Sequence, residues 1–200
     1  MWPWPEPRRT RWQEREFVVR CTAGLQQRRA RWLDIDRQCA RRLHRGAERM
    51  LLLRLLVVAS RLGDGGLWYA LMLVLPWLGS PEGLVCTLQM GAAGTLNVVL
   101  YRWVKLRTGR ERPCVDCPDI RACAKALDRY SFPSGHTLHA VSFSLLLSWH
   151  YAAWAPLAWA FTLLVAASRV VLGLHYPSDV VAGALTGFVT AGLLLGLWPW

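Results

Sequence analysis

Long apolar stretches separated by short polar segments dominate the chain from residue 67 onward. A helix needs about 20 residues to cross roughly 30 Å of hydrocarbon, and most of these stretches reach that length. The pattern predicts five transmembrane helices, at residues 67–78 with their flanks, 84–104, 134–152, 154–173 and 177–198. We therefore expect an all-α fold, a multi-pass transmembrane helical bundle.

Residues 50–60 form a shorter apolar run that allows two interpretations. The run contains Arg54 and is followed by Arg61. It is too short to cross the hydrocarbon layer as a helix. We expect a tilted, half-inserted helix that leads into the first span, and a short sixth span is the alternative.

A strongly basic segment precedes the apolar part. The pattern of residues 12–49 is helical, and apolar side chains recur there at spacings of three and four: Trp32, Ile35, Cys39 and Leu43. Such an amphipathic helix is suited to lie in the membrane interface beside anionic lipids. We expect two parts, a basic amphipathic N-terminal extension over residues 1–49 and a membrane-embedded domain over residues 50–200.

The uneven distribution of charge excludes several classes of protein. Hydrophobic residues make up 54% of the sequence and charged residues 18%, below the roughly 25% of soluble proteins. After residue 131 the only formally charged side chains are Arg169 and Asp179. A soluble surface needs more charge, so soluble, disordered and collagen-like chains are excluded. Basic stretches can also bind nucleic acid, but beside a membrane domain we expect membrane lipids as partners and no nucleic acid.

The six cysteines are too scattered for a disulfide framework: Cys21, Cys39, Cys86, Cys114, Cys117 and Cys123. The last three suggest a zinc site, but no fourth cysteine or well-spaced histidine completes it. A local disulfide, if the loop faces an oxidising compartment, and unpaired thiols are the alternatives. We expect no metal and no cofactor.

Three segments place polar residues at the ends of the predicted spans. Lys105 to Pro113 ends the second span, Pro133 to His136 begins the third, and Ser168 to Asp179 joins the fourth to the fifth. The first two flank one loop, and the third lies two crossings further on. All three therefore reach the same face of the membrane.

Together these segments contain the components of a phosphate site. Lys105, Arg112 and Arg169 supply three cations, and the arginine fork matches phosphate oxygens. Ser134 and the backbone N–H of Gly135 lie where a helix begins, a position that favours an anion.

The same segments hold candidate catalytic residues. His175 and Asp179 are four residues apart, close enough for a hydrogen bond between carboxylate and imidazole. Such a bond fixes the tautomer of the histidine and leaves its other nitrogen free to attack. His136 then remains as the proton donor to the leaving oxygen.

Other polar residues nearby have simpler interpretations. We interpret His139 and His150 as packing or interface residues, with a supporting role at the site conceivable for His139. Glu111 and Asp116 are interpreted as solvated loop acids. Charged groups within a span are costly and point to function, which favours the catalytic interpretation of His136, His175 and Asp179.

The three segments together resemble the signature of the type 2 phosphatidic acid phosphatase superfamily, which also includes the vanadium haloperoxidases. The pattern K-x6-RP, PSGH and SR-x5-H-x3-D is matched by these residues: Lys105, Arg112, Pro113, Pro133, Ser134, Gly135, His136, Ser168, Arg169, His175 and Asp179. The resemblance implies that His175 forms a phosphohistidine, that His136 is the general acid and that Asp179 orients His175. It also implies that Lys105, Arg112, Ser134, Gly135 and Arg169 bind the phosphoryl group without a metal.

The resemblance implies an integral membrane phosphatase that hydrolyses a lipid phosphate or diphosphate, such as undecaprenyl diphosphate or a phosphatidate-like lipid. Small size and the segment from Ser60 to Gly65 are most similar to bacterial undecaprenyl-diphosphatases. A lipid phosphotransferase with the same site and a non-catalytic lipid-binding protein are the alternatives. Haloperoxidases of the superfamily are soluble and much larger.

We expect the protein in the cell (inner) membrane, and two arguments bear on which side the site faces. With five spans the site and the N-terminus share one side, and their density of Lys and Arg is typical of the cytoplasmic face. A sixth span would turn the site outward, as a diphosphatase that recycles a carrier lipid requires. We expect an outward-facing site, by the resemblance.

Overall fold

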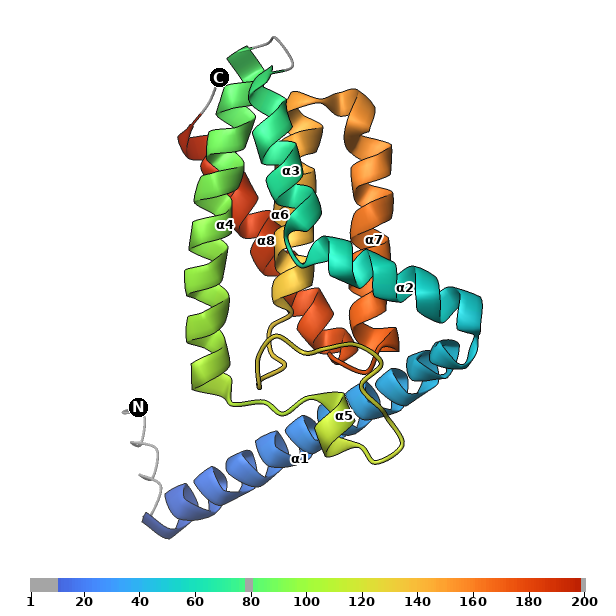
Figure 1. Ribbon diagram of the computed structural model, residues 1–200. Helices are drawn as coiled ribbons and strands as arrows, with labels where there is room; N and C mark the ends of the chain where they lie inside the picture. The colour runs from blue at the N-terminus through green and yellow to red at the C-terminus, as the bar shows by residue number, and fades with distance from the viewer. Residues whose placement is uncertain (1–10, 78–80, 199–200) are drawn as a thin grey trace, which may run out of the picture. The chain divides into compact units, whose positions relative to one another are not determined.

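The computed structural model describes residues 11–77 and 81–198, and this part of the chain is mostly helical, with an irregular loop at residues 117–134 and no strands (Figure 1). Its helices, in order, are α1 (Arg11–His44), η1 (Arg45–Glu48), α2 (Met50–Gly63), α3 (Gly66–Val74), η2 (Leu75–Trp77), α4 (Pro81–Thr108), α5 (Pro113–Asp116), α6 (Gly135–His150), η3 (Ala152–Trp154), α7 (Ala155–Val171) and α8 (Pro177–Leu197). The chain forms two units, residues 1–36 and 37–200. The described part of the first unit is helical, and the second contains everything that follows.

Helices α3, α4, α6, α7 and α8 form a bundle in which α6 is central (Figure 1). Helix α6 packs against α4, α7 and α8, and most of its side chains are buried, on every face of the helix. The core between these helices is apolar, with Trp68 in edge-on contact with Phe143 and Phe161. The predicted helical bundle is thus confirmed, and the helices begin and end within a few residues of the predicted spans.

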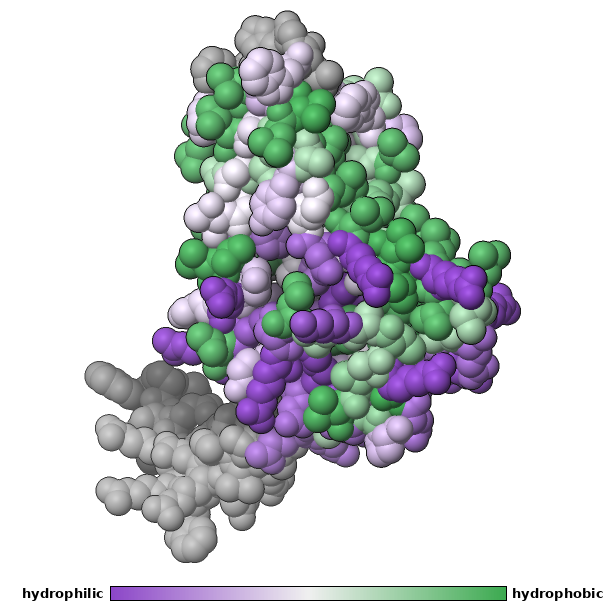
Figure 2. Space-filling view, in the orientation of Figure 1, coloured by the Kyte–Doolittle hydropathy of each residue, from purple (hydrophilic) through white to green (hydrophobic). Residues whose placement is uncertain are grey.

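The outer surface of the bundle is apolar, as expected for contact with lipid. Leu73, Leu157, Leu163 and Leu185 are all exposed, and Figure 2 shows apolar residues over the bundle and polar residues gathered at one end. Three described stretches are long and apolar enough to cross a membrane: Glu82–Asp116, Ala152–Val171 and Pro177–Leu197. The number of spans, five, stays a prediction.

Helix α2 begins and ends at the same end of the bundle. Ala47, just before α2, packs in a cluster with Val171 at the end of α7. Asp64, just after α2, contacts His136 at the start of α6. The end of α7 and the start of α6 lie together, so α2 runs across that end of the bundle (Figure 1). Whether α2 enters the membrane, as a half-inserted helix or as a sixth span, stays a prediction.

Glycines allow close packing between α6 and α8, but only in the first half of α8. A Cβ on Gly183 would lie 2.5 Å from the carbonyl oxygen of Ser134, and one on Gly187 would lie 2.5 Å from that of Leu138. Gly192 and Gly196 have open space around them. The same spacing of four therefore gives close packing at Gly183 and Gly187 but not at Gly192 and Gly196, because the second pair does not face a neighbouring helix.

Candidate active site

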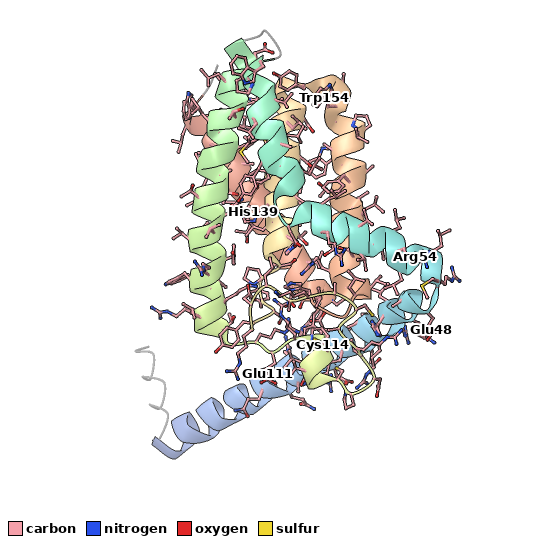
Figure 3. All side chains as sticks on the ribbon, viewed as in Figure 1. Glu48, Arg54, Glu111, Cys114, His139 and Trp154 are labelled. Atoms are coloured by element: carbon pink, nitrogen blue, oxygen red, sulfur yellow. The ribbon has the colours of Figure 1, made fainter. Side chains whose placement is uncertain are left out.

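A cavity of about 620 Å³ opens at the end of the bundle where the three predicted segments meet. One end of it is polar, lined by Lys105, Arg112, Asp128, His136, Arg169 and His175. The other is an apolar arm between α3 and α4, lined by Trp68, Met72, Met90, Val98 and Phe143. In Figure 3, Glu111 and Cys114 lie at the polar end of the bundle and Trp154 at the opposite end. The structure therefore brings together the candidate residues from all three segments.

A tight turn between α7 and α8 places Arg169 beside His175. The backbone N–H groups of Leu174 and His175 both donate to the carbonyl oxygen of Arg169, at 3.1 and 3.0 Å. Gly173 makes this turn possible, because its φ is +75° and a Cβ there would lie 2.5 Å from the carbonyl oxygen of Arg121. Pro177 then begins α8, at the position where a proline fits best.

The tautomer of His175 is identified by its contact with Arg112. Nη1 of Arg112 lies 3.1 Å from Nε2 of His175. A guanidinium can only donate, so Nε2 accepts and the proton of the neutral ring is on Nδ1. Burial, with Arg169, Arg112 and Lys105 nearby, lowers the pKa of His175 well below its ordinary value. His175 is therefore a neutral imidazole with a lone pair on Nε2, the form that a nucleophile needs.

The predicted hydrogen bond between His175 and Asp179 is not formed. Nδ1 of His175 lies 3.6 Å from Oδ2 of Asp179 and has no hydrogen-bond partner among the described residues. The carboxylate instead accepts from the N–H of Tyr176, at 2.8 Å, and from Nη1 of Arg110, at 2.7 Å. The spacing of four gave the correct proximity, but Asp179 also caps the first turn of α8, and capping competes for its oxygens.

Asp128, which the sequence analysis did not select, binds two of the three predicted phosphate-binding cations. Its carboxylate accepts from Nζ of Lys105, at 2.7 and 2.8 Å, and from Nη2 of Arg112, at 2.8 Å. Burial raises the pKa of Asp128, but the combined effect of Lys105 and Arg112 is larger and opposite, so the net pKa lies below the ordinary value. The carboxylate of Asp128 thus occupies donors of Lys105 and Arg112 that were predicted to bind phosphate oxygens.

The third cation, Arg169, is the most deeply buried. Its side chain is only 1% exposed, and Nη1 donates to the hydroxyl of Ser60 at 2.5 Å. Its Nε has no hydrogen-bond partner among the described residues. A buried guanidinium with an unpaired N–H is costly unless an anion binds it. Arg169 therefore points to an anionic ligand more strongly than either of the other cations.

At the start of α6, one predicted site residue is buried as the N-cap and the next two line the cavity. Ser134 is the N-cap, with its oxygen 3.5 Å from the N–H of Thr137, and it is fully buried. Gly135 and His136 line the cavity. His136 also forms a hydrogen bond with Asp64, which lies in the segment from Ser60 to Gly65 outside the three signature segments.

The simpler interpretations are partly confirmed. His139 packs against Tyr101 and Phe143 although it also lines the cavity, and His150 lies 2.8 Å from Gln89. Asp116 is exposed, as expected for a solvated acid, but it also has two partners. Its carboxylate accepts from the hydroxyl of Tyr176 at 2.6 Å and from Arg37 at 2.8 Å.

The cysteines that the structure describes are free, so the local disulfide considered for the loop is not formed. Cys117 is buried, and Cys114 and Cys123 are half-buried. Among the described residues no group of three or more His, Cys, Asp or Glu is placed to hold a metal ion. Cys21 lies outside the residues whose side chains are described.

Comparison with known proteins identifies the family. Relatives include a decaprenylphosphoryl-5-phosphoribose phosphatase of Mycolicibacterium smegmatis, 37% identical over 109 residues (53% of this chain and 57% of the relative). The undecaprenyl-diphosphatase BcrC of Bacillus subtilis is 34% identical over 129 residues (63% and 65%). The LpxE structure from Aquifex aeolicus has a similar fold, with a TM-score of 0.69 at 24% identity over 80% of this chain and 93% of that one. The family model of the PAP2 superfamily matches residues 84–200, and the chain belongs to this superfamily.

Proposed function

We propose that the protein is a membrane phosphatase that hydrolyses a phosphate monoester or diphosphate on a lipid. The observation that carries this proposal is the shape and chemistry of the cavity at this end of the bundle: its polar end holds three cations and two histidines, and its other arm is apolar. A lipid headgroup fits the first part, and its hydrocarbon tail fits the second. The names of the relatives, which are phosphatases of lipid-linked phosphates, support the same reaction.

In the first step, Nε2 of His175 attacks phosphorus. A P–N bond forms and the P–O bond to the leaving group breaks in line with it, while His136 gives its proton to the departing oxygen. Lys105, Arg112 and Arg169 stabilise the charge on the equatorial oxygens. The buried Nε of Arg169 has no hydrogen-bond partner among the described residues, so a phosphoryl oxygen bound there would satisfy this donor.

In the second step, water cleaves the phosphohistidine. His136, now neutral, accepts a proton from the water, and the P–N bond breaks to release inorganic phosphate and restore His175. Asp179, with its carboxylate 3.6 Å from Nδ1 of His175, balances the positive charge of the phosphorylated ring. No step calls for a metal ion.

Release of inorganic phosphate by the purified protein tests the proposal. We expect release from at least one of undecaprenyl diphosphate, undecaprenyl phosphate, phosphatidate and decaprenylphosphoryl-5-phosphoribose, with no effect of a chelator. Vanadate should inhibit, because its five-coordinate adduct on His175 resembles the transition state. Transfer to an added alcohol without free phosphate would identify a phosphotransferase, and binding without turnover would identify a lipid-binding protein.

The side of the membrane on which the site lies is a separate part of the proposal, and two arguments favour opposite sides. Similarity to undecaprenyl-diphosphatase favours an outward-facing site in the cell (inner) membrane. Against it, α2 begins and ends at the site, so the basic residues 37–48 lie on the same face as the loop of residues 109–134. The positive-inside rule associates such a face with the cytoplasm.

Thiol labelling in intact cells distinguishes the two orientations. We propose the outward orientation and expect a variant that keeps only Cys123 to react with an impermeant maleimide. Cys117 is unsuitable because it is buried, and burial raises the pKa of the half-buried Cys114. Protection of Cys123 until the cells are lysed would instead place the site in the cytoplasm. A variant without cysteine controls for labelling of other proteins.

A further inference from the structure

We propose that Asp64 is the positioning residue of the general acid, and that it orients His136 and stabilises the protonated form of this ring. The inference rests on the proposed function and assigns a role to a residue outside the three signature segments. It starts from the hydrogen bond between Oδ1 of Asp64 and Nε2 of His136.

Local structure brings Asp64 to this position. Gly63 ends α2 where a Cβ would lie 3.1 Å from Val165 and 3.8 Å from the ring of His136, so a larger residue would push the end of α2 away. Gly65 has a φ of +128°, which turns the chain sharply into α3. Ser60, one turn earlier in α2, binds Arg169. The last turn of α2 therefore holds two residues of the site, His136 and Arg169.

The contact determines which nitrogen of His136 transfers the proton. Burial raises the pKa of Asp64, but the combined effect of His136, Arg169 and Arg61 is larger and opposite, so the net pKa lies below the ordinary value. An ionised carboxylate only accepts, so Nε2 carries a proton and keeps it. Nδ1 is the nitrogen left to protonate the leaving oxygen in the first step and to accept a proton from water in the second. Nε2–H stays bonded to Asp64 in both steps, so the proton count balances.

The negative charge of Asp64 also stabilises the protonated form of His136. Arg169, His139 and His175 also lie near the ring, and a positive charge on any of them opposes protonation of His136. Asp64 is the negatively charged group that contacts the ring. Its removal would leave the imidazolium facing Arg169 without a counter-charge. The proton affinity of His136 therefore depends on Asp64.

Asp64→Asn tests the inference, because asparagine keeps the size of the side chain and removes its charge. A positioned general acid typically raises the reaction rate about 10²- to 10⁴-fold. We expect the variant to lose part of this rate enhancement, with kcat for a lipid phosphate about 10- to 100-fold lower. The alkaline limb of the kcat/KM profile should move to lower pH by about one unit or more. An aryl phosphate, whose leaving group needs little protonation, should lose much less.

Asp119→Asn is the matched control. Asp119 also contacts a basic side chain, that of Arg41 at 3.1 Å, but it does not line the cavity. We expect an unchanged pH profile for this variant. Asp64→Glu keeps the charge and should restore the position of the alkaline limb, even where the longer side chain lowers kcat.

Two results would overturn the inference. One is an Asp64→Asn enzyme whose pH profile and leaving-group dependence match the wild type. The other is equal loss at every pH and with both classes of substrate in a variant that still forms the phosphoenzyme, since that is the result of a purely structural role. Should Asp64→Asn not fold, Asp64→Glu with a shifted alkaline limb would also contradict it. Absence of phosphate release by the wild-type protein would instead contradict the proposed function.

Discussion

His175→Ala is expected to abolish both turnover and phosphoenzyme formation. The variant lacks the nitrogen that would form the P–N bond, whereas Lys105, Arg112 and Arg169 would still bind the phosphoryl group. Loss of a nucleophile typically costs at least about 10³-fold in kcat, and the remaining rate should be that of the bound lipid in water. Rapid quench with a ³²P-labelled lipid, followed by acid and alkali treatment, measures the intermediate, since a phosphohistidine is labile to acid.

His150→Ala is the matched control for this experiment. His150 lies at the other end of α6, where its Nε2 is 2.8 Å from Gln89. We expect normal turnover and a normal phosphoenzyme. An acid-labile phosphoenzyme that still forms in His175→Ala would assign the nucleophile to another residue, and full activity of that variant would exclude the mechanism.

The sequence predicted the helices and the meeting of the three segments because both depend on short-range pattern. A run of about 20 apolar residues is stable in a bilayer as a membrane-spanning helix. The parity of such runs then determines which ends share a face. Lys105, His136 and His175 could be brought together on these grounds, and the structure places all three around one cavity.

Residues of the irregular loop and of α2 could not be predicted in the same way. Asp128 reaches Lys105 and Arg112 through a loop without helical periodicity, and nothing in its spacing distinguishes it from other loop acids. Asp64 reaches His136 across 72 residues of sequence. Contacts of this kind depend on how α2 crosses the end of the bundle, which is a tertiary property.

The predicted hydrogen bond between His175 and Asp179, which is not formed, shows the limit of spacing even at short range. A separation of four residues placed the two side chains correctly, within 3.6 Å. Spacing does not say what else the carboxylate binds. The first turn of α8 and Arg110 both use the oxygens of Asp179, so no direct hydrogen bond joins Asp179 to His175.

Glycine spacing in α8 is a further case in which one pattern has two structural outcomes. Gly183 and Gly187 have the same separation as Gly192 and Gly196, yet only the first pair faces α6. The spacing shows that both members of a pair lie on one face of the helix. It does not show which neighbour that face meets, so the pairs differ sharply in what a substitution would do.

Gly187→Leu is therefore expected to separate α8 from α6 and to inactivate the protein, whereas Gly192→Leu should be tolerated. At position 187 the new Cβ would lie 2.5 Å from the carbonyl oxygen of Leu138, so the backbone of α6, which carries His136, has to move. Overpacking of this kind typically costs about 1–3 kcal/mol, and more where the backbone is rigid. At position 192 the leucine would lie in open space and would add one more apolar residue to the lipid-facing surface. Thermal unfolding in detergent and phosphate release measure both effects, and equal losses for the two variants would show that contact with α6 is not the cause.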